Sequence, residues 1–405
     1  MNTAAAPSRR NVWLLVLCMG AVQTVTVAQV AMAALIGHSL ADDKALATLP
    51  VAVWMTGTMA SSIPAALIFR KLGRRAGFVA GTLSAACGCA LMAFALWRAD
   101  FWLYTMAALP FGLGFGISQH YRFAAAEVAD KPFRAKAVSY VMVGGVVAAV
   151  LGPEIVRQTK EWIGPVLFMA SYAMMACLLA LNLVVLAIVD LPPPPPPAAG
   201  TGRPLSEIIR QKRFLAAAIG AAAGYGAMNL IMTSTPIEMM LCGFTVNDSA
   251  RVIQWHAVAM FAPSFVTGSF ITRFGAGRVI VAGAALTAVS SMVGIAGETM
   301  VHFVVALVFL GLGWNFMFVG GTSIQAEGWS PAERPKAQAL NDLIVFGTTT
   351  ATAFGSGAAH HAFGWTVINL GILVPLAGAA LAVPLLLRAH ARAHPPALQP
   401  AIPRA

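Results

Sequence analysis

The segment AEVADKPFRAKA at residues 126–137 returns as AEGWSPAERPKA at residues 326–337, with alanine, glutamate, arginine, lysine and alanine at matching positions. Two further matches accompany it. The run Gly-Leu-Gly occurs at residues 112–114 and again at 311–313, and a pair of glycines at 73 and 81 recurs at 275 and 283. Several independent matches in equivalent places indicate that the chain consists of two homologous halves.

The composition points to a protein that lies in a membrane. Of the 405 residues, 59% are hydrophobic and 10% are charged, whereas soluble proteins carry about 25% charged residues. The net charge of +11 comes from basic clusters between apolar runs, which is a sign of membrane topology and not of a nucleic-acid interface. The five cysteines have neither metal-ligand nor redox spacing, so we expect no metal site and no cofactor.

Apolar runs of about 20 residues, the length that crosses the hydrocarbon of a bilayer, predict an all-α integral membrane protein. Twelve transmembrane helices are expected, over residues 12–37, 45–69, 76–97, 101–127, 135–156, 165–189, 214–239, 248–272, 278–297, 302–325, 337–360 and 365–387. Most basic loop residues follow the even-numbered spans. Because positive loops stay inside, both termini are predicted to be cytoplasmic, in a multi-pass protein of the bacterial inner membrane.

A run of six prolines at residues 192–197 separates the spans into two sets of six. Proline runs form extended, semi-rigid spacers. We therefore predict an N-terminal six-helix bundle over residues 1–190, a cytoplasmic proline-rich linker over 191–213, a C-terminal six-helix bundle over 214–390 and a cytoplasmic tail over 391–405.

The loops after the second and eighth spans carry a family signature. The first contains Gly73-Arg74-Arg75, and the second runs from Gly268 through Arg273 to Gly275. They resemble the Gly-x-x-x-Asp-Arg-x-Gly-Arg-Arg motif of the major facilitator superfamily, and the resemblance covers essentially the whole chain. It implies the major facilitator fold, with two pseudo-symmetric six-helix bundles, and transport by alternating access. The aspartate of the motif is absent from both halves, where Arg70 and Thr272 stand.

Charged residues near the span ends are predicted to form a gating network. Glu127 with Arg134, and Glu327 with Arg334, would join helices when the cytoplasmic side closes; alternatively they are interfacial charges worth about 0–1 kcal/mol. Glu154 follows Gly152-Pro153 on the fifth span and is either interfacial or a proton acceptor. Glu238, at the end of the seventh span, is predicted to pair with Arg251.

Ionisable and polar groups inside the spans mark candidate sites, because they are costly in lipid. His120, Tyr121 and Arg122 lie near the cytoplasmic end of the fourth span, and Asn341 and Asp342 lie in the eleventh. Arg122 and Asp342 are at similar depth, and the superfamily fold brings their helices together at the cytoplasmic side. We predict that they pair across the halves when that side closes, although Arg122 could instead extend to the interface.

Tryptophans and amides at mid-helix depth supply a second set of candidates: Trp54, Asn229, Trp255, His256, Trp314 and Asn315. The resemblance implies a central cavity, and a cavity rich in tryptophan and amide groups suits a planar, partly aromatic ligand. The alternative for a single tryptophan is lipid contact or packing, and a lone histidine such as His256 is more often structural.

The runs Gln254-Trp255-His256, MFAPSF at residues 260–265, and Trp314-Asn315 resemble a proteobacterial permease subgroup for riboflavin uptake. This implies a small-molecule substrate, a flavin, with protons as the coupling ion and lipid as the surrounding solvent. The alternative is proton-coupled efflux of hydrophobic drug-like compounds, which is disfavoured because no further glycines follow Gly152-Pro153. The sequence contains no metalloprotease, P-loop or nucleophile-elbow motif, so we expect no enzyme.

Overall fold

The computed structural model describes residues 9–129, 134–191, 202–326, 329–330 and 333–393. These residues form helices and no β-strand. Among them, eight helices are long and apolar enough to cross a membrane, or nine when one bent pair is counted as a single span. The difference from the twelve predicted spans arises because some spans are broken into two helices and others are joined end to end.

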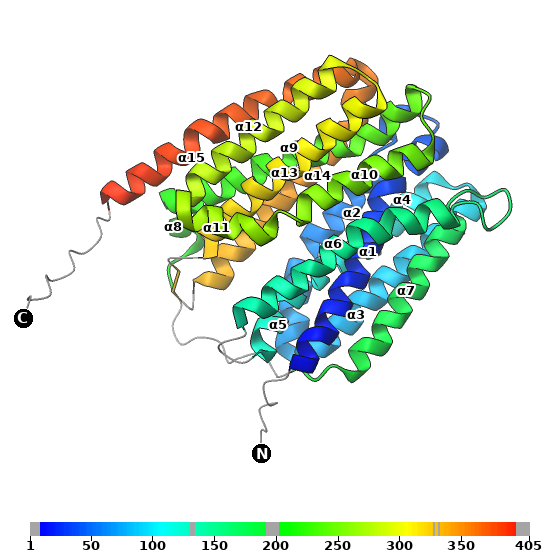
Figure 1. Ribbon diagram of the computed structural model, residues 1–405. Coiled ribbons are helices and arrows are strands. Elements are labelled where there is room, and N and C mark those ends of the chain that lie inside the picture. The colour runs from blue at the N-terminus through cyan, green and yellow to red at the C-terminus, as the bar shows by residue number, and fades with distance from the viewer. Residues whose placement is uncertain (1–8, 130–133, 192–201, 327–328, 331–332, 394–405) are drawn as a thin grey trace, which may run out of the picture.

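The first half contains α1 to α7, and the second contains α8 to α15 (Figure 1). The helices of the first half are α1 (Arg9–Leu40), α2 (Leu49–Ala60), α3 (Ser62–Arg98), α4 (Phe101–Ser118), α5 (Tyr121–Val128), α6 (Arg134–Thr159) and α7 (Met169–Ile188), with the 3-10 turn η1 (Lys44–Leu46) between α1 and α2. Those of the second half are α8 (Leu205–Ile208), α9 (Lys212–Leu241), α10 (Val246–Phe261), α11 (Ser264–Phe274), α12 (Ala276–Ala296), α13 (Met300–Ala326), α14 (Arg334–Gly371) and α15 (Leu373–Ala393).

Two of these helices each contain the junction between two spans. Gly73 interrupts α3 with a φ of 86°, and Gly364 interrupts α14 with a φ of 75°. Only glycine adopts such left-handed angles readily. Gly275, the repeat partner of Gly73, also has a φ of 86°, so the two loops that match in sequence also match in backbone conformation.

Four spans predicted as continuous helices are broken instead, the twelfth of them at Ile372, between α14 and α15. The second span breaks at Ser61, the fourth at Gln119–His120, and the eighth at Ala262–Pro263, where α10 and α11 meet at 41°. Proline cannot donate the backbone hydrogen bond that a continuous helix needs, which explains the break at Pro263. With broken pairs joined and α3 and α14 divided, the described helices make up twelve spans, six in each half.

Small residues allow close helix packing within the first half. A Cβ added to Gly112 on α4 would lie 2.1 Å from the backbone oxygen of Trp54 on α2, and one added to Gly57 would lie 2.5 Å from that of Leu109. Trp54 itself is buried edge-on to Phe111. In a bilayer, where helices gain little from burial, such close backbone contact is a principal source of association.

The two halves meet at one end of the molecule. The start of α1 and the end of α15 lie at the opposite end, toward the lower left of Figure 1, which we call the terminal face; the other end is the far face. Near the far face, the hydroxyl of Thr48 donates to the carbonyl of Ala353 at 2.8 Å and accepts from the N–H of Gly357 at 2.8 Å. Gln254 on α10 donates to the carbonyl of Val150 on α6 at 3.3 Å. The halves are therefore closed at the far face.

Replacing Gly112 with valine should separate α2 from α4 and lower stability by about 1–3 kcal/mol, the usual effect of overpacking. We expect the melting temperature of the purified protein in detergent to fall by several degrees. The control is Gly378→Val on α15, where an added Cβ meets nothing within 4 Å. Equal melting temperatures for the two variants would contradict the packing argument.

Candidate functional site

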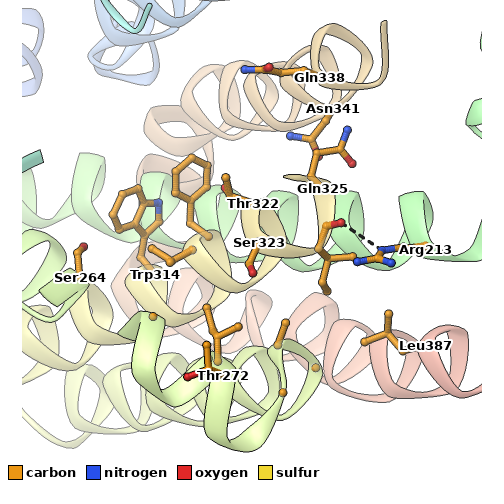
Figure 2. Close-up of a pocket in the computed structure, with 18 of the residues that line it drawn as sticks. Arg213, Ser264, Thr272, Trp314, Thr322, Ser323, Gln325, Gln338, Asn341 and Leu387 are labelled. Atoms are coloured by element: carbon orange, nitrogen blue, oxygen red, sulfur yellow. Dashed lines mark hydrogen bonds between the residues drawn. The ribbon is translucent and has the colours of Figure 1, made fainter. Parts of the chain in front are cut away.

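A cavity of about 1220 Å³ opens between the halves on the terminal side. Its walls come mainly from α11, α13, α14 and α15 of the second half, which carry most of the residues labelled in Figure 2. Of the described residues of the first half, Arg122 lines it. Arg213, Arg334 and His390, which lie at the terminal ends of α9, α14 and α15, border it. Because the far face is closed, the cavity is accessible from the terminal face.

An aromatic wall forms the deep part of the cavity. Trp314 and Phe318 on α13 stack with ring centroids 5.0 Å apart and an interplanar angle of 13°. Tyr225 and Phe261 contact Trp314 edge-on, at 5.4 and 6.2 Å. The indole N–H of Trp314 is buried and has no hydrogen-bond partner among the described residues.

Polar groups from both halves face this wall. Arg122 of α5 and Asp342 of α14 both line the cavity, and their charges interact. The Asn341 side chain also lines it, with its amide nitrogen 3.5 Å from Asp342 Oδ1. The structure thus brings together Arg122, Trp314, Asn341 and Asp342 from the residues chosen by sequence. The cavity offers a cation, an anion and amide groups beside a flat aromatic surface.

Several predicted cavity residues lie elsewhere, and these predictions are corrected. Trp54 packs in the core of the first half against Phe111 and Phe115. Trp255 is 56% exposed on the outer surface of α10. His256 is fully buried, with Nδ1 2.8 Å from the carbonyl oxygen of Leu307 on α13. Consecutive residues of a helix point in very different directions, and neither Trp255 nor His256 points at the cavity.

Two predicted amides connect helices. Asn315 donates to the carbonyl of Met260 and to the hydroxyl of Ser264, both at 2.7 Å, and accepts from Thr267 at 2.6 Å. It therefore satisfies polar groups at the α10–α11 break. Asn229 on α9 donates to the Thr349 carbonyl at 3.0 Å and to the Thr352 hydroxyl at 3.1 Å, both on α14. Neither amide is among the lining residues of the cavity.

His120 and Tyr121 belong to the first half and lie outside the cavity lining. The His120 ring packs edge-on against Phe69, with centroids 5.1 Å apart. Tyr121 is fully buried, and its hydroxyl lies 3.4 Å from the Asn182 amide nitrogen, which donates to it. Of the three consecutive candidates on this span, Arg122 alone lines the cavity.

The predicted pairs of Glu127 with Arg134 and of Glu327 with Arg334 remain predictions, because the side chain of one member of each lies outside the described residues. Glu127 forms its ion pair with Arg74 of the loop between the second and third spans. The Arg134 side chain and Glu327 lie outside the described residues, whereas Arg334 is exposed at the cavity border. Glu154 pairs with Arg157 one turn along α6, so it makes a contact within its own helix.

Sequence reasoning missed an ion pair on the terminal side, between Glu333 and Arg203. Arg203 Nη2 lies 2.9 Å from Glu333 Oε2, and the backbone N–H of Ser330 also donates to this carboxylate. These contacts, the Arg203 side chain first, hold the pKa of Glu333 well below its usual range. A glutamate directly before a helix is a recognisable signal, because helix N-termini favour negative charge.

Two six-helix halves that close at one face around a cavity open at the other have the architecture of a transporter working by alternating access. The sequence profile of the Major Facilitator Superfamily matches residues 12–263. The chain belongs to this superfamily, and it is a membrane transporter and not an enzyme.

Individual relatives agree with this assignment. The chain is 38% identical over 389 residues to the riboflavin transporter RfnT of Brucella anthropi, covering 95% of this chain and 97% of the relative. It is 30% identical to the uncharacterized transporter YdeG of Bacillus subtilis, covering 78% of each. A solved inward-facing bacterial homolog of the human lysosomal transporter Spinster matches with a TM-score of 0.70 at 14% identity, over 95% of this chain and 97% of that one; it is similar in fold alone.

Proposed function

We propose that this protein imports riboflavin, or a close flavin analogue, across the bacterial inner membrane by proton-coupled alternating access. The observation that carries this proposal is the stacked Trp314–Phe318 surface beside Arg122 and Asp342. The similarity to a riboflavin transporter over nearly the full chain supports the same substrate.

The chemistry of the cavity suits a flavin. The isoalloxazine ring is planar and aromatic, and an aromatic surface stabilises such a ring by stacking. The carbonyl and imide edge of the ring accepts and donates hydrogen bonds, for which Arg122 and Asn341 are available on the cavity walls. The volume of about 1220 Å³ exceeds the common 300–1,000 Å³ of small-molecule sites, so a flavin enters together with water.

The charges of the terminal face support a cytoplasmic location for it. Arg213, Arg334 and His390 border the cavity opening, and basic residues gather at the cytoplasmic side of membrane proteins. With this orientation the structure is an inward-facing state. Arg122 and Asp342, which come from different halves, would then approach further as the cytoplasmic side closes, and their attraction would stabilise the outward-facing state.

Riboflavin uptake is tested in a riboflavin-auxotrophic bacterium that lacks its own importer. Expression of this protein should give saturable entry of labelled riboflavin that unlabelled flavin competes away, and a protonophore should reduce it. Absence of uptake, with the protein shown to be in the membrane, would remove the flavin assignment. Faster loss of preloaded flavin or of hydrophobic dyes would instead indicate export.

Trp314→Leu should weaken substrate binding, because it removes the stacking surface. Loss of about 0.5–1.5 kcal/mol of aromatic interaction predicts a roughly three- to tenfold higher KM. The matched control is Trp255→Leu, since this tryptophan is 56% exposed on the outer surface and its loss should leave KM unchanged. Equal effects of the two substitutions on uptake kinetics would count against the aromatic wall as the binding surface.

Asp342→Asn should slow transport more than it destabilises the protein, because it leaves Arg122 without its partner when the cytoplasmic side closes. We expect turnover to fall about tenfold, as when a partly buried charge pair loses one member. Membrane levels and melting temperature should stay close to those of the wild type. Unchanged transport would eliminate the proposed pairing, and recovery in the double variant Arg122→Asp with Asp342→Arg would support it.

A further inference from the structure

A buried acid–base pair lies near the far face. Nε2 of His360 on α14 is 2.6 Å from Oε2 of Glu238 on α9, and the two side chains are only 7% and 12% exposed. The sequence had instead predicted a pair of Glu238 with Arg251. His360 and Glu238 are neither cavity residues nor part of the terminal charge network, so the transport cycle outlined above gives them no role.

Two further polar contacts join α9 and α14 on the side of this pair that faces the cavity. One turn below Glu238 and His360, the hydroxyls of Ser234 and Ser356 are 2.7 Å apart. The next contact is the 3.1 Å hydrogen bond from Asn229 to Thr352. We call Ser234, Ser356, Asn229 and Thr352 the polar seam; beyond it, the same helix α14 reaches Asp342 at the cavity wall.

The pair also lies next to the contact that closes the far face. Gly357, less than one turn from His360, donates its N–H to Thr48 of the first half. His38, near the end of α1, is close enough to His360 for an electrostatic interaction. A change in the charge of His360 therefore acts directly on the junction between the halves.

Protonation decides the net charge of this pair. With a neutral imidazole the pair carries −1, and one bound proton brings it to zero. A net charge that is buried away from water is costly, whereas a neutralised pair is tolerated. Proton binding should therefore favour the closed far face, and loss of the proton should favour its opening to water.

The surrounding titratable and charged groups belong to several elements. Cys242 Sγ of α9 lies 3.9 Å from Glu238 Oε1 and 3.6 Å from Oε2 of Glu298, which precedes α13. On the side of the first half, Lys44 donates to the His38 carbonyl at 2.7 Å. The negative charge of Glu298 favours a proton on the pair, and the positive charge of Lys44 opposes it. Both Glu298 and Lys44 are more exposed to solvent than the pair itself. Water screens their influence.

We propose that Glu238 and His360 bind the proton whose entry drives uptake; this inference rests on the proposed import function. In the outward-facing state, the imidazole takes one proton from external water and forms an N–H bond. The neutral pair permits the far face to close. In the inward-facing state this N–H bond breaks, and the same proton leaves along the polar seam to the cavity and the cytoplasm.

The test uses the full-length protein in proteoliposomes, with two measurements on labelled riboflavin. The first is exchange of external labelled for internal unlabelled flavin at equal pH on both sides. The second is accumulation with the interior one pH unit more alkaline and the membrane potential clamped, for which one proton per substrate allows about tenfold accumulation. The variants are Glu238→Gln, His360→Gln and the conservative Glu238→Asp, and the matched control is His361→Gln, an exposed neighbour.

We expect the Glu238→Gln and His360→Gln variants to exchange flavin. Their internal flavin concentration should not rise above the external concentration. Glu238→Asp, which keeps the carboxylate, and His361→Gln should both accumulate flavin. Accumulation in either glutamine variant, or equal loss of exchange and accumulation in both, would overturn the inference. Wild-type exchange without pH-driven accumulation would overturn proton coupling while leaving flavin transport intact, and no wild-type exchange would refute the proposed function itself.

Discussion

Lipid cannot hydrogen bond to a polypeptide backbone, and this constraint governs the whole structure. Each span must satisfy its own backbone groups, which is why the described membrane-crossing segments are helical. Where a helix breaks, side chains must supply the missing partners. At the α10–α11 break, Asn315 supplies such a partner, because its amide nitrogen donates to the Met260 carbonyl and the Ser264 hydroxyl. The break in turn directs α11 away from the axis of α10, and Ser264 and Gly268 consequently line the cavity.

The contacts between the halves differ in kind from those within them. Inside the first half, α2 and α4 approach closely at glycines, and such an interface cannot open without exposing backbone. At the far face, the halves are joined by hydrogen bonds from Thr48 and Gln254 to backbone groups. Water can replace each of these bonds when the face opens, since bonds exchanged with water contribute little net free energy. The molecule therefore combines rigid halves with a contact that can separate.

The fold was accessible from sequence, because hydrophobic length and repeated loop motifs are local signals. The paired glycines 73 and 275 have the same left-handed backbone, as homologous halves require. The sequence did not show how each helix is rotated about its own axis. A helix that is apolar on all sides has no periodic pattern that indicates which face meets the cavity. Trp54, on the apolar helix α2, was misplaced for that reason. Ion pairs such as Glu127 with Arg74, or Glu238 with His360, join distant segments, so sequence spacing could not identify them.

The two halves are also unequal in one respect. The fourth span is broken at Gln119–His120, whereas its repeat partner α13 continues unbroken from Met300 to Ala326 and carries the aromatic wall. Among the described residues, almost the whole cavity lining comes from the second half. When the two halves of a duplicated protein contribute so unequally to the cavity, the sequence of one half can change without altering the other. Selection for a new nutrient can then act mainly on the second repeat, while the first keeps its packing and its contribution of Arg122 to the cavity.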